Sequence, residues 1–287
     1  MEAQRITAGG LEFSYLALGD GPLALCLHGF PDSAHTWTEL LPALARRGFR
    51  AVAPWMRGFA PTDVPGDGRY QGGALVGDAV ALHDAFGGDG QAVIIGHDWG
   101  AFAAYGAGAY APDRWRRVVA LSIPPLALTS QALFDYDQLR RFWYQFFFLH
   151  PVADQVVAVN DLAFIDRLWA DWSPGIKAGQ PLEQAKAALR PEGALAAALG
   201  YYRAMYDPSG HAPELAEHQQ ALLEPTSQPT LYLHGQNDGC VSAGLGEGAE
   251  AYLGPGSRRV VVPDTGHFLH LEDPGTVIRE IVDFVAP

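Results

Sequence analysis

Short apolar segments alternate with segments of helical spacing along the first 125 residues of the chain. Runs such as 22–29 and 91–97 are almost continuously apolar, which is typical of strands buried on both faces of a sheet. The predicted strands of this part are 11–19, 22–29, 49–55, 91–97 and 116–125. The predicted helices between them are 33–48, 74–86 and 100–112.

The same rhythm returns near the C-terminus, with predicted strands 229–235 and 257–263 and predicted helices 244–254 and 274–285. Alternating strands and helices predict an α/β fold with a mostly parallel sheet and helices on both faces. Residues 126–225 contain no clear strand and are rich in aromatics, alanine and proline. The sequence therefore predicts a core domain of residues 1–125 and 226–287, with a helical cap of residues 126–225 inserted into it.

Composition narrows the class of partners. A formal net charge of −13 over 287 residues argues against a nucleic-acid-binding surface. The polar N-terminus and the lack of a long apolar run predict a cytoplasmic protein without a membrane segment. The two cysteines lie far apart and form no metal or redox motif. The sequence leaves open whether the chain is a monomer or a homodimer.

Candidate catalytic residues follow three of the predicted strands. Asp98 follows strand 91–97 within GHDWG, Asp238 follows strand 229–235, and His267 follows strand 257–263. Ligands bind at the carboxyl ends of parallel strands, so these side chains are expected to converge. The flanking glycines of GHDWG allow a tight strand-to-helix turn that exposes the central residue. Asp264 is a rival to Asp238, but it precedes the His267 loop.

The chain resembles α/β-hydrolases of the epoxide hydrolase group over nearly its whole length. The matching motifs are HGFPDS (28–33), MRGF (56–59), GHDWGA (96–101), FWYQ (142–145), GYYR (200–203), NDGC (237–240) and GHFLHLEDP (266–274). The resemblance implies an α/β-hydrolase fold with a helical cap. It also implies catalysis without a cofactor or a metal.

The family mechanism that the resemblance implies begins with attack of Asp98 on an epoxide carbon. His267, oriented by Asp238, then activates a water that hydrolyses the ester. Backbone N–H groups of Phe30 and Trp99 are the expected oxyanion hole of this second step. The products are vicinal diols.

The resemblance also implies that two cap tyrosines, Tyr144 in FWYQ and Tyr202 in GYYR, hold the epoxide oxygen. Tyr201 is the principal rival to Tyr202, and Tyr206 is a weaker one. An apolar run at 146–148 indicates a hydrophobic pocket or cap interior. The expected partners are therefore a small lipophilic epoxide and water.

Two other functions remain open from the sequence. GHDWG also occurs in haloalkane dehalogenases, in which indole N–H groups bind the departing halide, and Trp99 and Trp143 are candidates for that role. Phe30 stands where those enzymes often carry asparagine. The third function is a non-catalytic protein that keeps the pocket for a small ligand. Separately, Cys240, which lies near Asp238 in the sequence, is expected to be a small buried filler.

Overall fold

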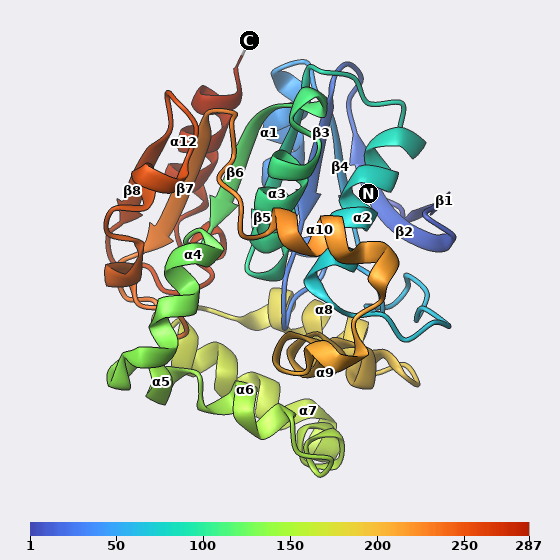
Figure 1. Cartoon of the computed structure of the whole chain (residues 1–287), viewed down its shortest axis with the longest axis vertical. Helices are drawn as coiled ribbons and strands as arrows, with labels where there is room; N and C mark the ends of the chain where they lie inside the picture. The colour runs from blue at the N-terminus through green and yellow to red at the C-terminus, as the bar shows by residue number, and fades with distance from the viewer. Residues whose placement is uncertain (287) are drawn as a thin grey trace.

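The computed structural model describes residues 1–286, which contain one eight-stranded sheet in the order β1-β2-β4-β3-β5-β6-β7-β8 (Figure 1). The pairs β1–β2 and β2–β4 are antiparallel, and the remaining pairs are parallel. The strands are β1 (Gln4–Ala8), β2 (Leu11–Leu18), β3 (Leu23–Leu27), β4 (Arg50–Pro54), β5 (Ala92–His97), β6 (Trp115–Leu121), β7 (Thr230–Gly235) and β8 (Arg258–Val262). The predicted mostly parallel sheet is confirmed.

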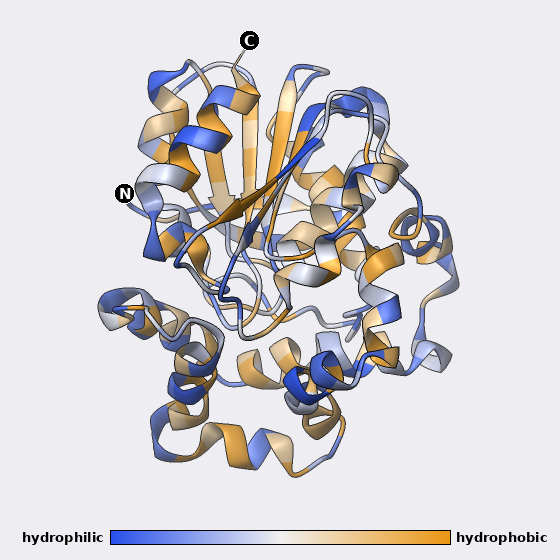
Figure 2. Cartoon of the chain, turned by 90° about the vertical axis from the view of Figure 1, so that its left-hand side faces the viewer, coloured by the Kyte–Doolittle hydropathy of each residue, from blue (hydrophilic) through white to orange (hydrophobic). Residues whose placement is uncertain are grey.

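Helices cover both faces of the sheet, and the strands form the apolar interior (Figure 2). Every residue of β3, β5 and β7 is buried, which accounts for their continuous apolar sequences. The helices against the sheet are α1 (Leu40–Arg46), α2 (Gly72–Ala85), α3 (Trp99–Tyr110), α10 (Ala216–Ala221) and α12 (Pro274–Val285). Helix α12 begins where the Asp273 side chain accepts a hydrogen bond from the N–H of Thr276.

The segment between β6 and β7 is helical, and no residue described there belongs to a strand. Its remaining helices are α4 (Leu126–Thr129), α5 (Tyr136–Arg141), α6 (Trp143–Phe148), α7 (Ala153–Trp172), α8 (Gly179–Leu189) and α9 (Ala194–Tyr206). The backbone of α7 leaves the helical conformation at residues 159–162. Helices α5 to α9 lie beyond the carboxyl ends of the strands, whereas α10 packs on α2 and α3 (Figure 1).

The structure corrects two predicted helices. Residues 244–254 form two 3₁₀ turns, Ala243–Gly246 and Ala249–Tyr252, because four glycines within the segment disfavour a continuous α-helix. The predicted helix 33–48 divides into a 3₁₀ turn at Ala34–Trp37 and helix α1. Helix α11 (Leu269–Glu272) is a short addition after the His267 loop. Within residues 1–286, no helix combines the length and apolar character needed to cross a bilayer.

Candidate active site

Asp98 occupies a strained turn between β5 and α3, with φ 52° and ψ −120°. The positions around Asp98 must be glycine because a larger side chain would clash with the neighbouring backbone or with Asp98 itself. A Cβ atom on Gly96 would lie 2.0 Å from the carbonyl oxygen of Gly100, and one on Gly100 would lie 2.2 Å from that of Leu27. A Cβ on Gly29 would come within 2.3 Å of Asp98 Oδ1. These three glycines therefore leave room for the tight turn and for the Asp98 carboxylate at the carboxyl end of the sheet.

The Asp98 carboxylate meets a backbone donor on one oxygen and a histidine near the other. The N–H of Phe30 donates to Oδ1 at 2.7 Å, and His267 Nε2 lies 3.6 Å from Oδ2. The peptide bond from Phe30 to Pro31 is cis. Trp99 begins α3 directly after Asp98, and its side chain lines the cavity described below.

His267 is held by Asp238, the predicted orienting acid. His267 Nδ1 lies 2.9 Å from Asp238 Oδ2, so the ring donates this proton and keeps Nε2 toward Asp98. The other oxygen of Asp238 accepts from the N–H groups of Cys240 and Val241 at 2.7 and 2.8 Å. The rival Asp264 is exposed and takes no part in this contact.

Burial and the neighbouring charges shift the pKa values of His267 and Asp238 in opposite directions. Burial alone would lower the pKa of His267, but the Asp238 and Asp98 carboxylates outweigh it and raise that pKa to about 10. Burial would raise the pKa of Asp238, yet His267 and His234 hold it below its usual range. His267 is therefore a cation between two carboxylates at neutral pH.

We expect this cation to make stability fall as the pH rises. The folded protein holds the His267 proton up to a pKa of about 10, whereas the unfolded chain loses it near 6.5. The stabilisation is complete below 6.5, and it is lost as the pH rises through 10. Urea unfolding at several pH values should show the free energy of unfolding of the wild type declining relative to that of His267→Gln. Parallel pH profiles for the two proteins would contradict this assignment.

A buried polar cluster supports the His267 loop from behind. His97 Nε2 and Ser122 Oγ both hydrogen-bond to the carbonyl oxygen of His267, at 2.9 and 2.6 Å. Burial, with the neighbouring histidines, keeps the pKa of His97 well below its usual range, so His97 is neutral. Asp32, His97 and His270 form the one group of three possible metal ligands among residues 1–286. Thr36 contacts His270 Nε2 at 2.6 Å, and His97 is the member of this group that hydrogen-bonds to the His267 backbone.

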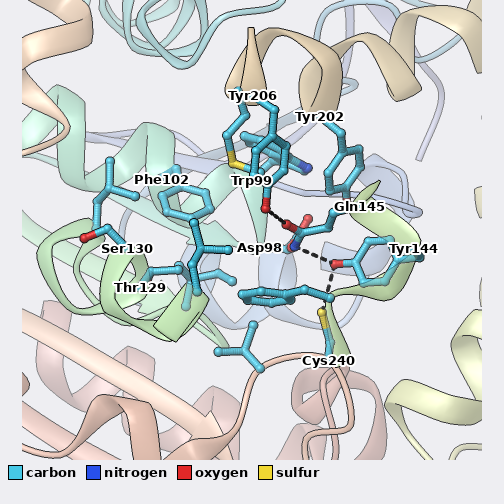
Figure 3. Close-up of a pocket in the computed structure, with 16 residues that line it drawn as sticks. Asp98, Trp99, Phe102, Thr129, Ser130, Tyr144, Gln145, Tyr202, Tyr206 and Cys240 are labelled. Carbon is cyan, nitrogen blue, oxygen red and sulfur yellow. Dashed lines mark hydrogen bonds between the residues drawn. The ribbon is translucent and has the colours of Figure 1, made fainter. Parts of the chain in front are cut away.

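Of the four predicted or rival tyrosines, Tyr144, Tyr202 and Tyr206 line one cavity with Asp98, whereas Tyr201 does not. Tyr144 from α6 and Tyr202 from α9 are buried, with ring centroids 5.6 Å apart, and both line a cavity of about 210 Å³ with Asp98 (Figure 3). The Tyr202 hydroxyl has no hydrogen-bond partner among the described residues. Tyr201 instead donates its hydroxyl proton to the carbonyl of Arg57 at 2.8 Å, away from the cavity.

The cavity is apolar apart from a few hydroxyl, amide and thiol groups. Among the lining residues that the structure describes, Asp98 alone carries a charge. Burial raises the pKa of both Tyr144 and Tyr202 well above the usual value, and the Asp98 carboxylate adds to this effect. Both phenols therefore stay protonated and can donate hydrogen bonds. Trp143, the second candidate halide donor, is 49% exposed and does not line the cavity.

Three residues near the site were given no catalytic part by the sequence. His234 Nε2 lies 3.2 Å from Asp238 Oδ2, and its position four residues before Asp238 was the available signal. Gln145 lines the cavity and donates to the Tyr144 hydroxyl at 3.1 Å. Cys240 is buried as predicted, and its sulfur contacts the same hydroxyl at 3.3 Å.

Comparison with known proteins agrees with this geometry. The family model described as alpha/beta hydrolase fold matches residues 22–274. Epoxide hydrolase 3 of Xenopus tropicalis is 30% identical over 98% of this chain and 76% of its own length. The AB hydrolase superfamily protein YfhM of Bacillus subtilis is 27% identical over 99% of this chain and 98% of its own.

Solved structures agree as well. A structure from work on novel epoxide hydrolases in metagenomes from hot environments superposes with a TM-score of 0.83 and 27% identity, covering 100% of this chain and 99% of that one. The fold, the family model and these relatives all indicate an α/β-hydrolase. The chain belongs to the α/β-hydrolase family and, within it, is an epoxide hydrolase-like protein.

Proposed function

We propose that the protein hydrolyses epoxides to vicinal diols through an ester formed on Asp98. The observation that carries this proposal is that the hydroxyls of Tyr144 and Tyr202 belong to the same buried cavity as the Asp98 carboxylate. A carboxylate can open a strained ring at saturated carbon, but the departing alkoxide needs hydrogen-bond donors or a proton. The relatives named epoxide hydrolase support the same activity.

The proposal assigns residues 126–225 to a cap over a core of residues 1–125 and 226–287. Asp98 comes from the core, whereas the two tyrosines come from α6 and α9, so the cavity needs both parts. Helix α10 lies within the assigned cap range but packs on core helices. The cap therefore contributes to the cavity through α4 and the 3₁₀ turn after it, α6 with the preceding Phe142, and α9, rather than through its whole length.

In the first step, an oxygen of Asp98 attacks one epoxide carbon and the bond from that carbon to the epoxide oxygen breaks. The epoxide oxygen takes a proton from Tyr144 or Tyr202, leaving an ester, a new hydroxyl and a tyrosinate. Because the ester has lost the charge of Asp98, one of the two carboxylates that raise the pKa of His267 is gone. His267 then gives its proton to the tyrosinate and becomes a neutral base.

In the second step, neutral His267 takes a proton from water, and the hydroxide adds to the carbonyl carbon of the ester. The tetrahedral intermediate collapses when the bond between its central carbon and the ester oxygen attached to the substrate breaks. That oxygen leaves with the substrate and takes the proton of the added hydroxyl. Asp98 is again a carboxylate and His267 again a cation, so the sum is epoxide plus water to diol. Asp238 stabilises the cation throughout, through the 2.9 Å contact with Nδ1.

Phe30 and Trp99 are the proposed oxyanion donors of the second step. The Phe30 N–H already donates to Asp98 Oδ1 at 2.7 Å, the oxygen that bears the negative charge in the tetrahedral intermediate. Trp99 starts helix α3, so its N–H belongs to the unpaired amides at that helix end. A preorganised donor of this kind contributes about 3 kcal/mol to such a step.

The expected substrate is a small lipophilic epoxide. Phe102, Ile123 and Leu133 are among the apolar residues that line the cavity, and no cationic side chain lies there among the described residues to hold an acidic substrate. Burial of the substrate's apolar part supplies binding energy, and the tyrosines orient the ring. Turnover is thus expected to favour aryl and alkyl epoxides over epoxides bearing a carboxylate.

We expect Tyr202→Phe to lower kcat/KM for epoxides by about a hundredfold, because one donor to the leaving oxygen is lost. Tyr201→Phe is the matched control. It removes the hydroxyl that bonds to the Arg57 carbonyl, so it should cost about 1 kcal/mol of stability and leave turnover nearly unchanged. Steady-state kinetics and urea unfolding of both variants test this assignment. An equal loss of turnover in the two variants would contradict it.

A panel of epoxides and haloalkanes of similar size tests the proposed reaction itself. Diol formation without halide release is the expected result. The dehalogenase alternative needs a second halide donor, and the exposed position of Trp143 weighs against that residue. Halide release without diol formation would overturn the proposal, and binding without turnover would favour the non-catalytic function.

A further inference from the structure

Hydrogen bonds connect Tyr206, Gln145 and Tyr144 along one side of the cavity (Figure 3). The Tyr206 hydroxyl donates to Gln145 Oε1 at 2.8 Å, and Gln145 Nε2 donates to the Tyr144 oxygen at 3.1 Å. The Tyr144 hydroxyl also contacts Cys240 Sγ at 3.3 Å. All four side chains line the cavity, and those of Tyr144, Gln145 and Cys240 are buried.

The chemistry of these groups gives the chain a direction. An amide nitrogen can only donate a hydrogen bond, so Gln145 occupies a lone pair of the Tyr144 oxygen and leaves its proton free. In the structure the Tyr206 hydroxyl donates to the amide oxygen, and the amide nitrogen faces the Tyr144 oxygen. With the amide reversed, its oxygen would accept the Tyr144 proton and withhold it from a substrate.

The other partner of Tyr144 competes only weakly for its proton. Burial raises the pKa of Cys240 well above its usual value, and Asp238 and Asp98 add to this, so the sulfur is a neutral thiol. A neutral thiol is a poor hydrogen-bond acceptor. The Tyr144 hydroxyl can therefore direct its proton toward an epoxide oxygen with little loss from the contact with Cys240.

We propose that Gln145 is a positioning residue that keeps the Tyr144 hydroxyl proton available to the epoxide oxygen during ring opening, an inference that rests on the proposed function. As the epoxide carbon–oxygen bond breaks, the proton moves from Tyr144 to the departing oxygen and negative charge grows on the phenol oxygen. The Gln145 N–H bond to that oxygen strengthens as the charge grows, so it stabilises the transition state more than the ground state.

The test measures ring opening alone, as the rate at which the substrate ester accumulates on His267→Gln, followed by intact-protein mass with an aryl epoxide. In this background, Gln145→Met keeps the side-chain length but removes the donor, and is expected to slow ester formation tenfold to a hundredfold, roughly the effect of one lost donor. In a background that also carries Tyr144→Phe, the same change should have almost no effect, because the group that Gln145 serves is absent.

Gln145→Glu supplies a second variant of nearly the same shape. Its carboxylate would accept the Tyr144 proton, so ester formation is expected to be slow at pH 8 and to recover toward the parent rate as the buried carboxyl is protonated at lower pH. A merely structural role for Gln145 would not produce this pH dependence.

The outcomes separate this inference from the proposed function. Failure of His267→Gln to accumulate any ester counts against the proposed function itself. Ester accumulation that is equally fast with and without Gln145→Met would overturn the role of Gln145. So would an equal slowing by Gln145→Met in the presence and absence of the Tyr144 hydroxyl, because the effect would then not pass through Tyr144.

Discussion

Replacement of Asp98 by asparagine is expected to abolish epoxide turnover, with a loss on the order of 10⁴-fold or more. The amide is a poor nucleophile, so the ester cannot form. It also leaves His267 without one of its two carboxylate neighbours, 3.6 Å from Nε2. Diol formation measured with purified Asp98→Asn and wild type, at equal concentrations of folded protein, checks this result.

Asp264→Asn is a suitable control for the Asp98 substitution. It makes the same chemical change in an exposed carboxylate that does not contact His267, and it should leave turnover close to that of the wild type. Retention of diol formation by Asp98→Asn would rule out the proposed nucleophile. It would point instead to direct attack of water on the epoxide.

His267→Gln is expected to stop the reaction halfway, with one substrate bound covalently to each protein molecule. Ring opening needs Asp98 and the tyrosines, whereas ester hydrolysis needs a base, and glutamine cannot take the proton from water. Intact-protein mass after mixing with an epoxide should rise by the mass of the substrate. Digestion should place the added mass on the peptide that contains Asp98.

The double variant Asp98→Asn with His267→Gln serves as the control for that experiment. It keeps the altered residue 267 but lacks the nucleophile, so it should gain no mass. An unchanged mass for His267→Gln itself, under conditions where the wild type forms diol, would contradict the two-step mechanism. An adduct on Cys240 instead of Asp98 would contradict the assignment of the nucleophile.

The predictable parts of the fold are the elements in which burial determines the pattern of apolar residues. Strands β3, β5 and β7 are buried along their whole length, and their apolar runs indicate this without any structure. Strand β1 was not predicted, because QRITA is short and mostly exposed and is stabilised by pairing with β2. In residues 244–254 an apolar rhythm suggested a helix, but the glycines prevented it.

The residues of the candidate site also divide into those that could be predicted from the sequence and those that could not. Asp98, Asp238 and His267 could be found because each follows a strand and the sheet brings strand ends together. The choice of Tyr202 over Tyr201 came from the motif, and in the structure the Arg57 carbonyl binds the Tyr201 hydroxyl. Gln145 could not be assigned, because its contact with Tyr206 joins α6 to α9 and depends on how the two helices pack.

A single turnover in water labelled with oxygen-18 tests the nucleophile most directly. In the proposed mechanism, with protein in excess over epoxide, the oxygen added to the substrate comes from the Asp98 carboxylate and the water oxygen stays on the protein. The account predicts an unlabelled diol and a peptide containing Asp98 that has gained one heavy oxygen. A labelled diol from the first turnover, with an unlabelled Asp98 peptide, would contradict it, because water would then have attacked the epoxide directly.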